Sequence, residues 1–487
     1  MSKKVKIGVI TDIHYGDKIS ISARQGQIGD ILLLRTVHRL NRMIKPDITL
    51  ILGDILDDPD SRKSGERLAK MQEILNLLES PWMAIPGNHD PVEDRFYKVI
   101  DRPPVFMDIK GVRFVPFIDP EELGWNAKRL PENIEKMKKV RSNHDGPIVA
   151  FQHVPLFPPN KSDCCYNYTN IDEVLEAIWA NNFTLSIGGH YHAGTELIRD
   201  GNHSFVVGKS LCESPFSFME INLDSEDIQV THHEHQMPPK LELFDYHSHT
   251  QFAYCSENMD MVKSPELAEK FGLRGIAFTE HSGQLYFDRQ TYWSGELCQE
   301  GIKGTKGLQD RMPDFWLNVE EVQRDNLIIG FEVDSDFQGN MILQNEDQQR
   351  AQLLNGAIHQ LPELRKEKVD LKRATDEYLR ILECFVQTGI QILAHPFRIF
   401  RSHEVPTKLF VPVIRMLREN NVAAEMNFHF NRPQPEFVKM CVEAGVKITF
   451  GSDAHNLYEV GEFAPHLKLL DEIGYKGDLK DIMARID

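Results

Sequence analysis

The chain has 487 residues, and its 55 Lys and Arg against 73 Asp and Glu give a formal net charge of −18. With 41% hydrophobic and 26% charged residues, the composition is that of a folded globular protein, which excludes a mainly disordered or fibrous chain. That length allows roughly two to four domains, each able to bury a core. An acidic surface repels phosphate backbones and anionic lipids, so the charge disfavours nucleic acid or a membrane as a partner.

Seven cysteines, an odd number without a Cys-x-x-Cys pair, predict no disulfide framework. No apolar stretch approaches the roughly 18 residues that span a bilayer, and Met1 leads through Lys3 and Lys4 directly into a strand-like run. We therefore expect a cytoplasmic protein that contacts no membrane. The 20 histidines indicate metal binding, because imidazole and carboxylate are the commonest ligands of Zn, Mn and Fe.

Short β-branched runs alternate with longer amphipathic stretches along the chain, which is the pattern of α/β units. In the first half, four apolar runs too short for helices are predicted to be buried strands: 5–10, 48–52, 148–151 and 185–187. Three stretches with apolar residues three and four apart are predicted to be helices packed on the sheet: 29–43, 67–78 and 171–180. Residues 217–232 alternate around a turn at 224–226 and predict an antiparallel hairpin.

A domain boundary is predicted at residues 236–240, because the paired prolines there can continue neither a helix nor a central strand. The first domain would span 1–236, a linker 237–242 and the second domain 243–487. Six strands are predicted beyond the linker: 242–246, 275–278, 327–333, 390–393, 422–426 and 446–450. Helices are predicted between them, among them 374–387, 408–420 and 435–444. This order predicts a parallel barrel with its site at the carboxyl-terminal rim, interrupted by an insertion at 285–325.

Five short polar segments stand at strand ends in the first domain. An Asp-x-His or His-x-His pair that leaves a strand points both side chains to one side of the pleat, so each pair can reach a common ion. A lone carboxylate such as Asp54 can bridge two ions, and two cations about 4 Å apart can hold both the attacking and the leaving oxygen of a phosphoryl transfer. The segments are Thr11-Asp12-Ile13-His14, Gly53-Asp54, Gly87-Asn88-His89-Asp90, Gln152-His153 and Gly189-His190-Tyr191-His192.

The order of these segments resembles the metallophosphoesterase superfamily, also called calcineurin-like phosphoesterases, and every block matches over residues 5–235. The resemblance implies a four-layer αββα sandwich that holds two divalent metals. His89 would be an outer-sphere acid that protonates the leaving group, with Asp90 as its orienting partner. The implied ligands are Asp12, His14 and His192 for one metal, Asn88, His153 and His190 for the other, and Asp54 between them.

A second series of polar segments stands at predicted strand ends of the second domain. So many imidazoles and carboxylates on one rim would be electrostatically costly without cations between them. The segments are Asp245-Tyr246-His247-Ser248-His249-Thr250, Thr279-Glu280-His281, Gly330-Phe331-Glu332, Ala357-Ile358-His359, Ala394-His395-Pro396, Glu425 and Gly451-Ser452-Asp453-Ala454-His455. Their order resembles the PHP family, named for polymerase and histidinol phosphatase, whose fold is a distorted (β/α)7 barrel with up to three metals.

The PHP resemblance implies two or three metal sites in this domain. Their ligands would be His247, His249, Glu332 and Asp453 for one metal, Glu332, His359 and His395 for a second, and His281 with His455 for part of a third. Where the family usually has a further His, this chain has Cys255, which is either a thiolate ligand or a small buried apolar residue. Arg398 is either a phosphate clamp or an ordinary solvated side chain. Three other histidines are interpreted as scattered over the surface: His403, His429 and His466.

Both halves resemble metal-dependent phosphoester hydrolases, so we predict a hydrolase with two active centres for small phosphorylated substrates. The first centre would cleave a phosphodiester of the cyclic-nucleotide type and the second the resulting phosphomonoester, because joining consecutive steps raises the local concentration of the intermediate. A nuclease or nucleic-acid repair phosphodiesterase is an alternative, which the acidic charge of both halves disfavours. A third hypothesis makes one domain a metal-stabilised regulatory module. The choice among Mn, Fe, Zn and Co, and the oligomeric state, stay open.

Overall fold

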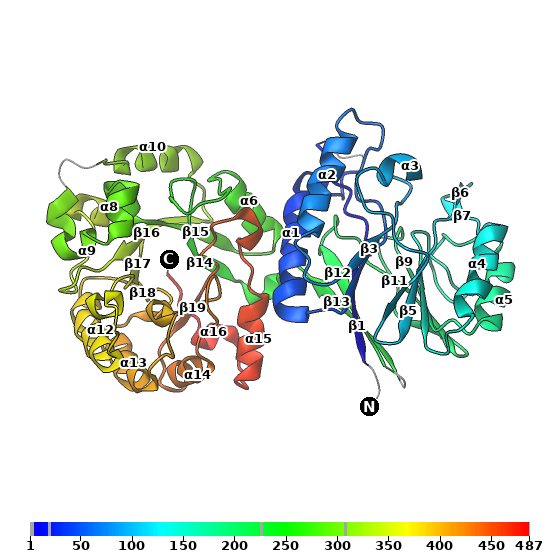
Figure 1. Ribbon diagram of the computed structural model, residues 1–487. Coiled ribbons are helices and arrows are strands. Elements are labelled where there is room, and N and C mark those ends of the chain that lie inside the picture. Colours follow the sequence, from blue (N-terminus) through cyan, green and yellow to red (C-terminus); the bar gives the residue numbers. More distant parts are fainter. Residues whose placement is uncertain (1–3, 18–20, 225–226, 306–308, 487) are drawn as a thin grey trace. The chain divides into compact units, whose positions relative to one another are not determined.

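The computed structural model describes residues 4–17, 21–224, 227–305 and 309–486, and the chain divides into two compact units, Met1–Gln236 and Met237–Asp487 (Figure 1). Each unit has its own sheets and its own hydrophobic core. Within the described ranges, no helix combines the length and the apolar character needed to cross a membrane. The fold class is α/β in both units.

The N-terminal unit is built on two mixed sheets. The first has the strand order β13-β12-β1-β2-β3 and the second the order β10-β11-β9-β8-β5-β4, with parallel pairing among the central strands. A short pair, β6-β7, lies outside them. The strands are β1 (Val5–Ile10), β2 (Ile48–Ile51), β3 (Trp82–Ala84), β4 (Met107–Ile109), β5 (Val112–Pro116), β6 (Glu121–Glu122), β7 (Asn126–Ala127), β8 (Ile148–Phe151), β9 (Leu185–Gly188), β10 (Ile198–Asp200), β11 (His203–Val207), β12 (Ser217–Leu223) and β13 (Ile228–Glu234).

Helices cover the outer faces of both sheets, which gives the predicted four layers αββα (Figure 1). Between the sheets, apolar side chains such as Leu50 and Phe151 form one shared core. On the far face of the second sheet, Met137 and Val174 bring two helices into a second core. The helices are α1 (Gly29–Arg39), α2 (Ser64–Leu75), α3 (Glu93–Phe96), α4 (Pro131–Arg141) and α5 (Ile171–Ala180).

The predicted elements of this unit are mostly confirmed, with shifted ends. The helix predicted over 29–43 is α-helical to Arg39 and continues as a π-helical segment, Leu40–Ile44. The predicted hairpin is formed by β12 and β13, and residues 225–226 of its turn lie outside the described residues. The strands β3, β4 and β5 escaped the sequence analysis because they are only three to five residues long, and in β4 and β5 a charge or a proline also obscures the apolar run.

The C-terminal unit is a single parallel sheet whose strand order follows the chain from β14 to β20. The sheet nearly closes into a barrel, because the Asp453 amide donates to the His247 carbonyl at 2.7 Å and the His249 amide to the Ala454 carbonyl at 3.1 Å. The predicted seven-unit barrel is therefore confirmed. Its strands are β14 (Phe244–Ser248), β15 (Gly275–His281), β16 (Leu327–Asp334), β17 (Leu353–Ala357), β18 (Ile392–Leu393), β19 (Ala423–Asn427) and β20 (Ile448–Gly451).

Helices surround the strands of this unit (Figure 1). The predicted insertion at 285–325 lies between β15 and β16 and contains three helices and the end of a fourth. Its residues 306–308 lie outside the described residues. The helices are α6 (Lys263–Lys270), α7 (Ser282–Tyr286), α8 (Arg289–Ser294), α9 (Leu297–Glu300), α10 (Met312–Val322), α11 (Asn345–Arg350), α12 (Leu371–Phe385), α13 (Phe410–Glu419), α14 (Pro435–Glu443), α15 (Ala464–Glu472) and α16 (Leu479–Ile482).

The strand β17 is missing from the sequence prediction, because its centre is Asn355-Gly356, a pair typical of a turn. In the barrel the Asn355 amide is buried and donates to the Tyr246 carbonyl at 2.8 Å. A Cβ on Gly356 would lie 2.5 Å from a methyl group of Ile390, so only glycine lets this neighbour approach. Tertiary packing has overridden the local turn signal.

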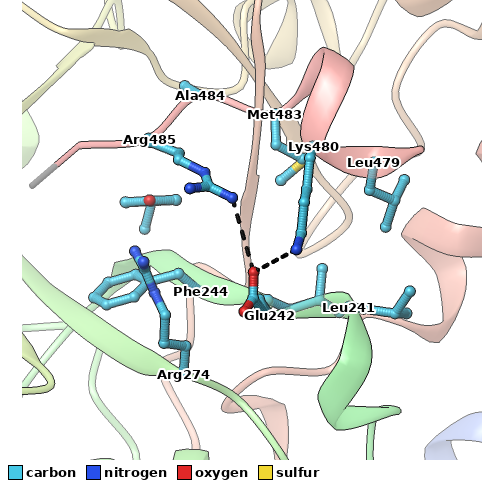
Figure 2. Close-up of a pocket in the computed structure, with 11 residues that line it drawn as sticks. Leu241, Glu242, Phe244, Arg274, Leu479, Lys480, Met483, Ala484 and Arg485 are labelled. Carbon is cyan, nitrogen blue, oxygen red and sulfur yellow. Dashed lines mark ion pairs between the residues drawn. The ribbon is translucent and has the colours of Figure 1, made fainter. Parts of the chain in front are cut away.

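A small pocket lies at the amino-terminal end of the barrel strands, away from the predicted ligands (Figure 2). Glu242 forms ion pairs there with Lys480 at 2.9 Å and with Arg485 at 3.8 Å. The Ala484 amide also donates to the Ile448 carbonyl at 2.8 Å, which adds the last residues to the edge of β20. In parallel barrels this end of the strands is concerned with stability, and catalysis takes place at the opposite rim.

The interpretation of His466 as a surface histidine is wrong. Its ring is 1% exposed and lies among Phe428, Phe450 and Phe463, and its Nε2 is 3.0 Å from the Met426 carbonyl oxygen. Burial lowers the pKa of His466 to about 4. Its position on α15 gave no sign of this, because a single His on an amphipathic helix reads as part of the polar face.

We expect His466 to make the C-terminal unit less stable as the pH falls. Its pKa in the folded chain is about 4, below the value of 6.5 in the unfolded chain, so its contribution is complete above pH 6.5 and is lost progressively toward pH 4. Urea unfolding of the full chain, measured at several pH values, gives the free energy of unfolding. Across that window the parent should lose about 1.4 kcal/mol per pH unit because of His466, and His466→Phe should lack this part of the loss. Equal slopes for both proteins would contradict the expectation.

Candidate metal centres

The candidate ligands of the N-terminal unit follow the carboxyl ends of five strands. Asp12 and His14 follow β1, Asp54 follows β2, Asn88 follows β3, His153 follows β8, and His190 with His192 follow β9. Because β1, β2 and β3 run parallel, as do β8 and β9, their ends bring these side chains to the same edge. The structure thus brings together every residue that the sequence analysis named as a ligand here.

The side chains form two adjoining groups. In the first, the Nε2 atoms of His14 and His192 are 3.2 Å apart, and Asp12 Oδ1 is 3.9 and 3.6 Å from them. In the second, His153 Nε2 is 3.0 Å from Asn88 Oδ1. The ring of His190 lies 5.0 Å from that of His153.

Asp54 lies between the two groups. Its Oδ2 is 3.4 Å from His14 Nε2 and 3.4 Å from His153 Nε2, so one carboxylate oxygen faces both sets of imidazoles. Although burial opposes its ionisation, the charge of His153 holds the pKa of Asp54 well below its usual value. A bridging carboxylate between two cations needs this position and this charge.

The residues present fit cations at this edge. In the described part of the chain, Asp12 Oδ1 and His190 Nε2 are buried without a hydrogen-bond partner, which a bound cation would provide. Burial opposes ionisation of Asp12, yet a hydrogen bond and the charge of His192 lower its pKa to about 2. Burial lowers the pKa of His190 to about 4, so its ring stays neutral and keeps a lone pair. Metal binding requires carboxylates and neutral imidazoles of this kind.

Several ligand residues have left-handed backbone conformations, which side chains other than glycine seldom adopt. The φ angles are 54° at Asp12, 47° at His14, 52° at Asp54 and 65° at His190. In the C-terminal unit, His395 and Asp453 share this feature, with φ angles of 28° and 53°. Backbone strain of this kind is concentrated at functional sites, where the surrounding structure holds it in place.

His89 reaches the N-terminal centre, but Asp90 does not orient it as predicted. The Nδ1 of His89 donates to the Asp57 carbonyl at 2.9 Å, since a carbonyl can only accept. The carboxylate of Asp90 instead accepts the amides of Ile55, Leu56 and Gly87 and thereby fixes two ligand loops. Burial raises the pKa of Asp90 to about 7. The prediction that Asp90 orients His89 is therefore wrong, because the Asp57 carbonyl does so. A backbone carbonyl that accepts from a ring cannot be recognised in the sequence.

Three further residues contact the first group of ligands and were missed. Asp57 Oδ1 lies 3.3 Å from His14 Nδ1, and Glu213 Oε1 lies 2.7 Å from His192 Nδ1, so each carboxylate sets the orientation of a ring. The buried thiol of Cys212 forms a group with His14 and His192 in which the potential ligand atoms lie within 4.8 Å of one another. None of the three belongs to a recognisable motif.

Glu332 is the centre of the cluster in the C-terminal unit. Its carboxylate oxygens lie 2.6 Å from His395 Nε2, 3.3 Å from His359 Nε2 and 2.7 Å from His281 Nδ1. The Nε2 atoms of His247 and His249 are 3.6 and 3.7 Å away. Five imidazoles from four strand ends therefore face one fully buried carboxylate.

A second buried carboxylate, Asp453, completes this cluster. Its Oδ1 is 2.9 Å from His249 Nε2 and 3.6 Å from His247 Nε2. Its Oδ2 accepts from the guanidinium of Arg398, which also donates to Asn427 at 2.7 Å. Arg398 is therefore part of the centre and not a solvated side chain, while its role as a phosphate clamp stays a prediction.

The remaining predicted residues lie at one side of the cluster. His249, His281 and His455 place their potential ligand atoms within 4.8 Å of one another. Cys255 Sγ is 3.7 Å from His281 Nε2 and accepts from the Gln284 amide at 3.6 Å. Burial raises the pKa of the Cys255 thiol to about 12. The position of Cys255 suits a thiolate ligand, whereas its raised pKa suits a protonated thiol as long as no cation is bound. The assignment of Cys255 as a metal ligand therefore stays a prediction.

The C-terminal cluster also fits cations. Glu332 Oε2, His281 Nδ1 and His247 Nε2 are buried, and none has a hydrogen-bond partner among the described residues, because their close approaches lack hydrogen-bond geometry. A set of outer carboxylates fixes the rings from behind: Glu425 for His247 at 2.8 Å, Glu280 for His249 at 3.3 Å and Asp334 for His359 at 2.6 Å. Rings that bind metals are oriented by partners of this kind.

His429 was also wrongly interpreted as scattered over the surface. Its ring stacks on that of His455 with 4.6 Å between centroids, and its Nδ1 is 3.1 Å from Glu459 Oε1. The next residue, Phe430, is 64% exposed. Of the three histidines, His403 alone is exposed as predicted.

The two units share one arrangement: an α/β fold with a cluster of imidazoles and carboxylates at the carboxyl ends of its parallel strands. The calcineurin-like phosphoesterase family model matches residues 5–194, and the PHP domain model matches residues 245–429. Each unit of the chain therefore contains a segment similar to one of these two families. Both families imply divalent metal ions.

Known proteins resemble parts of the chain. A probable glycerophosphodiester phosphodiesterase of Arcobacter nitrofigilis is 31% identical over 85 residues, which are 18% of this chain and 30% of that protein. A probable phosphatase of Acetivibrio thermocellus is 26% identical over 241 residues, 47% of this chain and 86% of that protein. The crystal structure of a dimetal phosphatase from Danio rerio aligns at 16% identity over 47% of this chain and 96% of its own, with a TM-score of 0.41. The chain thus spans less than a third of the first relative.

Proposed function

We propose that the chain hydrolyses small phosphorylated substrates at two separate centres, a phosphodiester in the N-terminal unit and a phosphomonoester in the C-terminal unit. The observation that supports this is the pair of ligand clusters, one around Asp54 and one around Glu332, each with buried polar atoms that have no hydrogen-bond partner among the described residues. Two divalent ions in the first cluster and two or three in the second would supply Lewis acid chemistry and a nucleophilic water at neutral pH.

In the N-terminal unit, His89 is the residue placed to handle a proton. Hydrolysis joins a water oxygen to phosphorus and breaks the bond from phosphorus to the alcohol, whose oxygen must then take up a proton. Because His89 Nδ1 is held by the Asp57 carbonyl, its Nε2 remains available to the substrate. The half-buried ring lies 4.8 Å from that of His14, which places it beside the ligands and not among them.

In the C-terminal unit, Arg398 is the residue placed to hold a phosphoryl group. Its guanidinium is anchored by Asp453 and Asn427, so the fork has a fixed direction before a substrate arrives. A fixed guanidinium binds phosphate at a smaller entropic cost than a mobile one. Phosphate release from a monoester would therefore take place between Arg398 and the ligand cluster.

The two centres can be separated by one substitution in each. Asp54→Asn should abolish hydrolysis of a phosphodiester such as bis(4-nitrophenyl) phosphate and leave that of a monoester, and Asp453→Asn should do the reverse. Both variants are assayed as full chains loaded with the same divalent metal, against phosphodiesters, phosphomonoesters and cyclic nucleotides. If each variant retains both activities, the assignment of one reaction to each centre is refuted. If the parent cleaves neither class of ester, the proposed function itself is refuted.

A further inference from the structure

A small pocket opens directly beside the C-terminal centre. His395, Arg398 and Asn427 from the centre form one wall. Phe397 and Phe437, whose ring centroids are 4.7 Å apart, contribute apolar surface. Apolar surface combined with a few polar groups is typical of sites for small organic molecules.

Further polar groups of the pocket come from the loop that follows β19, and the buried Glu425 of β19 also lines it. Asn431, Arg432 and Gln434 line it there, opposite the residues that follow β18. Arg432 is exposed and forms an ion pair with Glu472 on α15. Its guanidinium therefore lies in water at the edge of an apolar recess, where a second anion can reach it.

Further positive charge lies around Phe430, which precedes the lining residue Asn431 but does not itself line the pocket. The guanidinium groups of Arg398 and Arg401 lie 5.3 and 5.5 Å from the ring centroid of Phe430, an exposed residue of the same loop. Within the described residues, the Arg401 guanidinium has no carboxylate within 4.0 Å, whereas that of Arg398 is balanced by Asp453. A cleft with an excess of one charge raises the local concentration of ligands of the opposite charge.

We propose that this pocket binds the alcohol part of the monoester and selects alcohols that carry a second negative charge, which the lining residue Arg432 binds. The phosphoryl group lies at the metal ligands, so the ester oxygen points past Arg398 into the pocket. The substrate class is a phosphomonoester of a small, partly apolar alcohol with a carboxylate or a second phosphate. This inference rests on the proposed phosphatase activity of the C-terminal unit and names the substrate of that centre.

The test uses two phosphonates that cannot be hydrolysed, phenylphosphonate and 4-carboxyphenylphosphonate, which differ only in the second charge. Calorimetric titration of the metal-loaded full chain should show the carboxylated compound binding roughly fivefold more tightly, as expected for one partly screened charge pair. Arg432→Gln should reduce that ratio, and Arg432→Lys should restore part of it. Glu472→Gln removes the competing carboxylate and should increase the ratio.

Arg415→Gln on the exposed face of α13 is the matched control and should leave the ratio unchanged. Equal binding of the two phosphonates by the parent, or a ratio that none of the Arg432 and Glu472 variants alters, overturns the inference. Turnover of phenyl phosphate, measured in parallel, tests the proposed function separately. A chain that discriminates between the phosphonates but hydrolyses no monoester would refute the activity and leave the binding site standing.

Discussion

Replacing Glu332 with Gln is expected to empty the C-terminal centre of metal and to lower phosphomonoester hydrolysis at least about 1,000-fold. The carboxylate faces five imidazoles and has no exposed surface, so an amide in its place leaves the rings without their common negative partner. An amide oxygen carries no charge and binds divalent ions weakly. Metal content of the purified full chain by mass spectrometry, together with monoester turnover, measures both effects.

Asp347→Asn is the matched control, because it makes the same change at a buried carboxylate of the same unit. Asp347 accepts from Tyr286 and from Trp316 Nε1 at 2.8 Å, and in the described chain it forms no ion pair with an imidazole. It should keep the metal content and the activity of the parent. Diester hydrolysis by the N-terminal unit should survive in both variants. A Glu332→Gln protein with full metal content and full turnover would show that the cluster is structural.

The second large effect is expected at His89, where His89→Asn should slow the hydrolysis of an alkyl phosphodiester roughly 100- to 1,000-fold. The ring is oriented by the Asp57 carbonyl, and its potential ligand atom lies within 4.8 Å of those of His14 and Asp57. The proposed ligand sets do not include it, so we expect the metal content to stay unchanged. The loss should nearly vanish for a 4-nitrophenyl ester, because that leaving group departs without a proton. Turnover of the two esters, measured over pH 5 to 9, separates proton delivery from binding.

The control for this substitution is His144→Asn, at a half-buried histidine of the same unit that contacts only the Pro147 carbonyl among the described side-chain hydrogen bonds. It should leave both esters unaffected. An equal loss for the alkyl and the nitrophenyl ester in His89→Asn would mean that His89 positions the phosphate and donates no proton. Loss of metal from His89→Asn would show that His89 is a metal ligand and would contradict its role as a proton donor.

Residues that follow strands could be predicted from the sequence because strand direction carries them to one edge. Asp12, Asp54 and Glu332 each follow or end a buried apolar run, and all three lie where the motifs predicted. The partners that orient the rings could not be predicted in the same way. Glu213 and Asp57 meet their histidines through packing, so nothing in their local sequence distinguishes them from surface acids.

The fold shows the same division between local and tertiary causes. Long apolar runs such as β1 and β16 were recognisable, whereas β17 was hidden by its Asn-Gly pair and β18 is reduced to Ile392–Leu393. His466 and His429 were misjudged because the burial of a helix or loop residue depends on what packs against it. The sequence pattern predicts well which side chains of a strand are buried. It does not predict which loop covers the rim of a barrel.

The left-handed backbone at six ligand residues has a consequence for the supply of metal in a cell. Those φ angles set the path of the backbone at each ligand residue, and therefore the direction in which its side chain leaves the chain. A cage of nitrogen and oxygen atoms discriminates weakly among Mn, Fe, Co and Zn, whose affinities follow their intrinsic order. The metal ion that each cluster binds then depends on which ion is abundant when the chain folds. Specific activities of two preparations can therefore be compared only when both carry the same amount of metal.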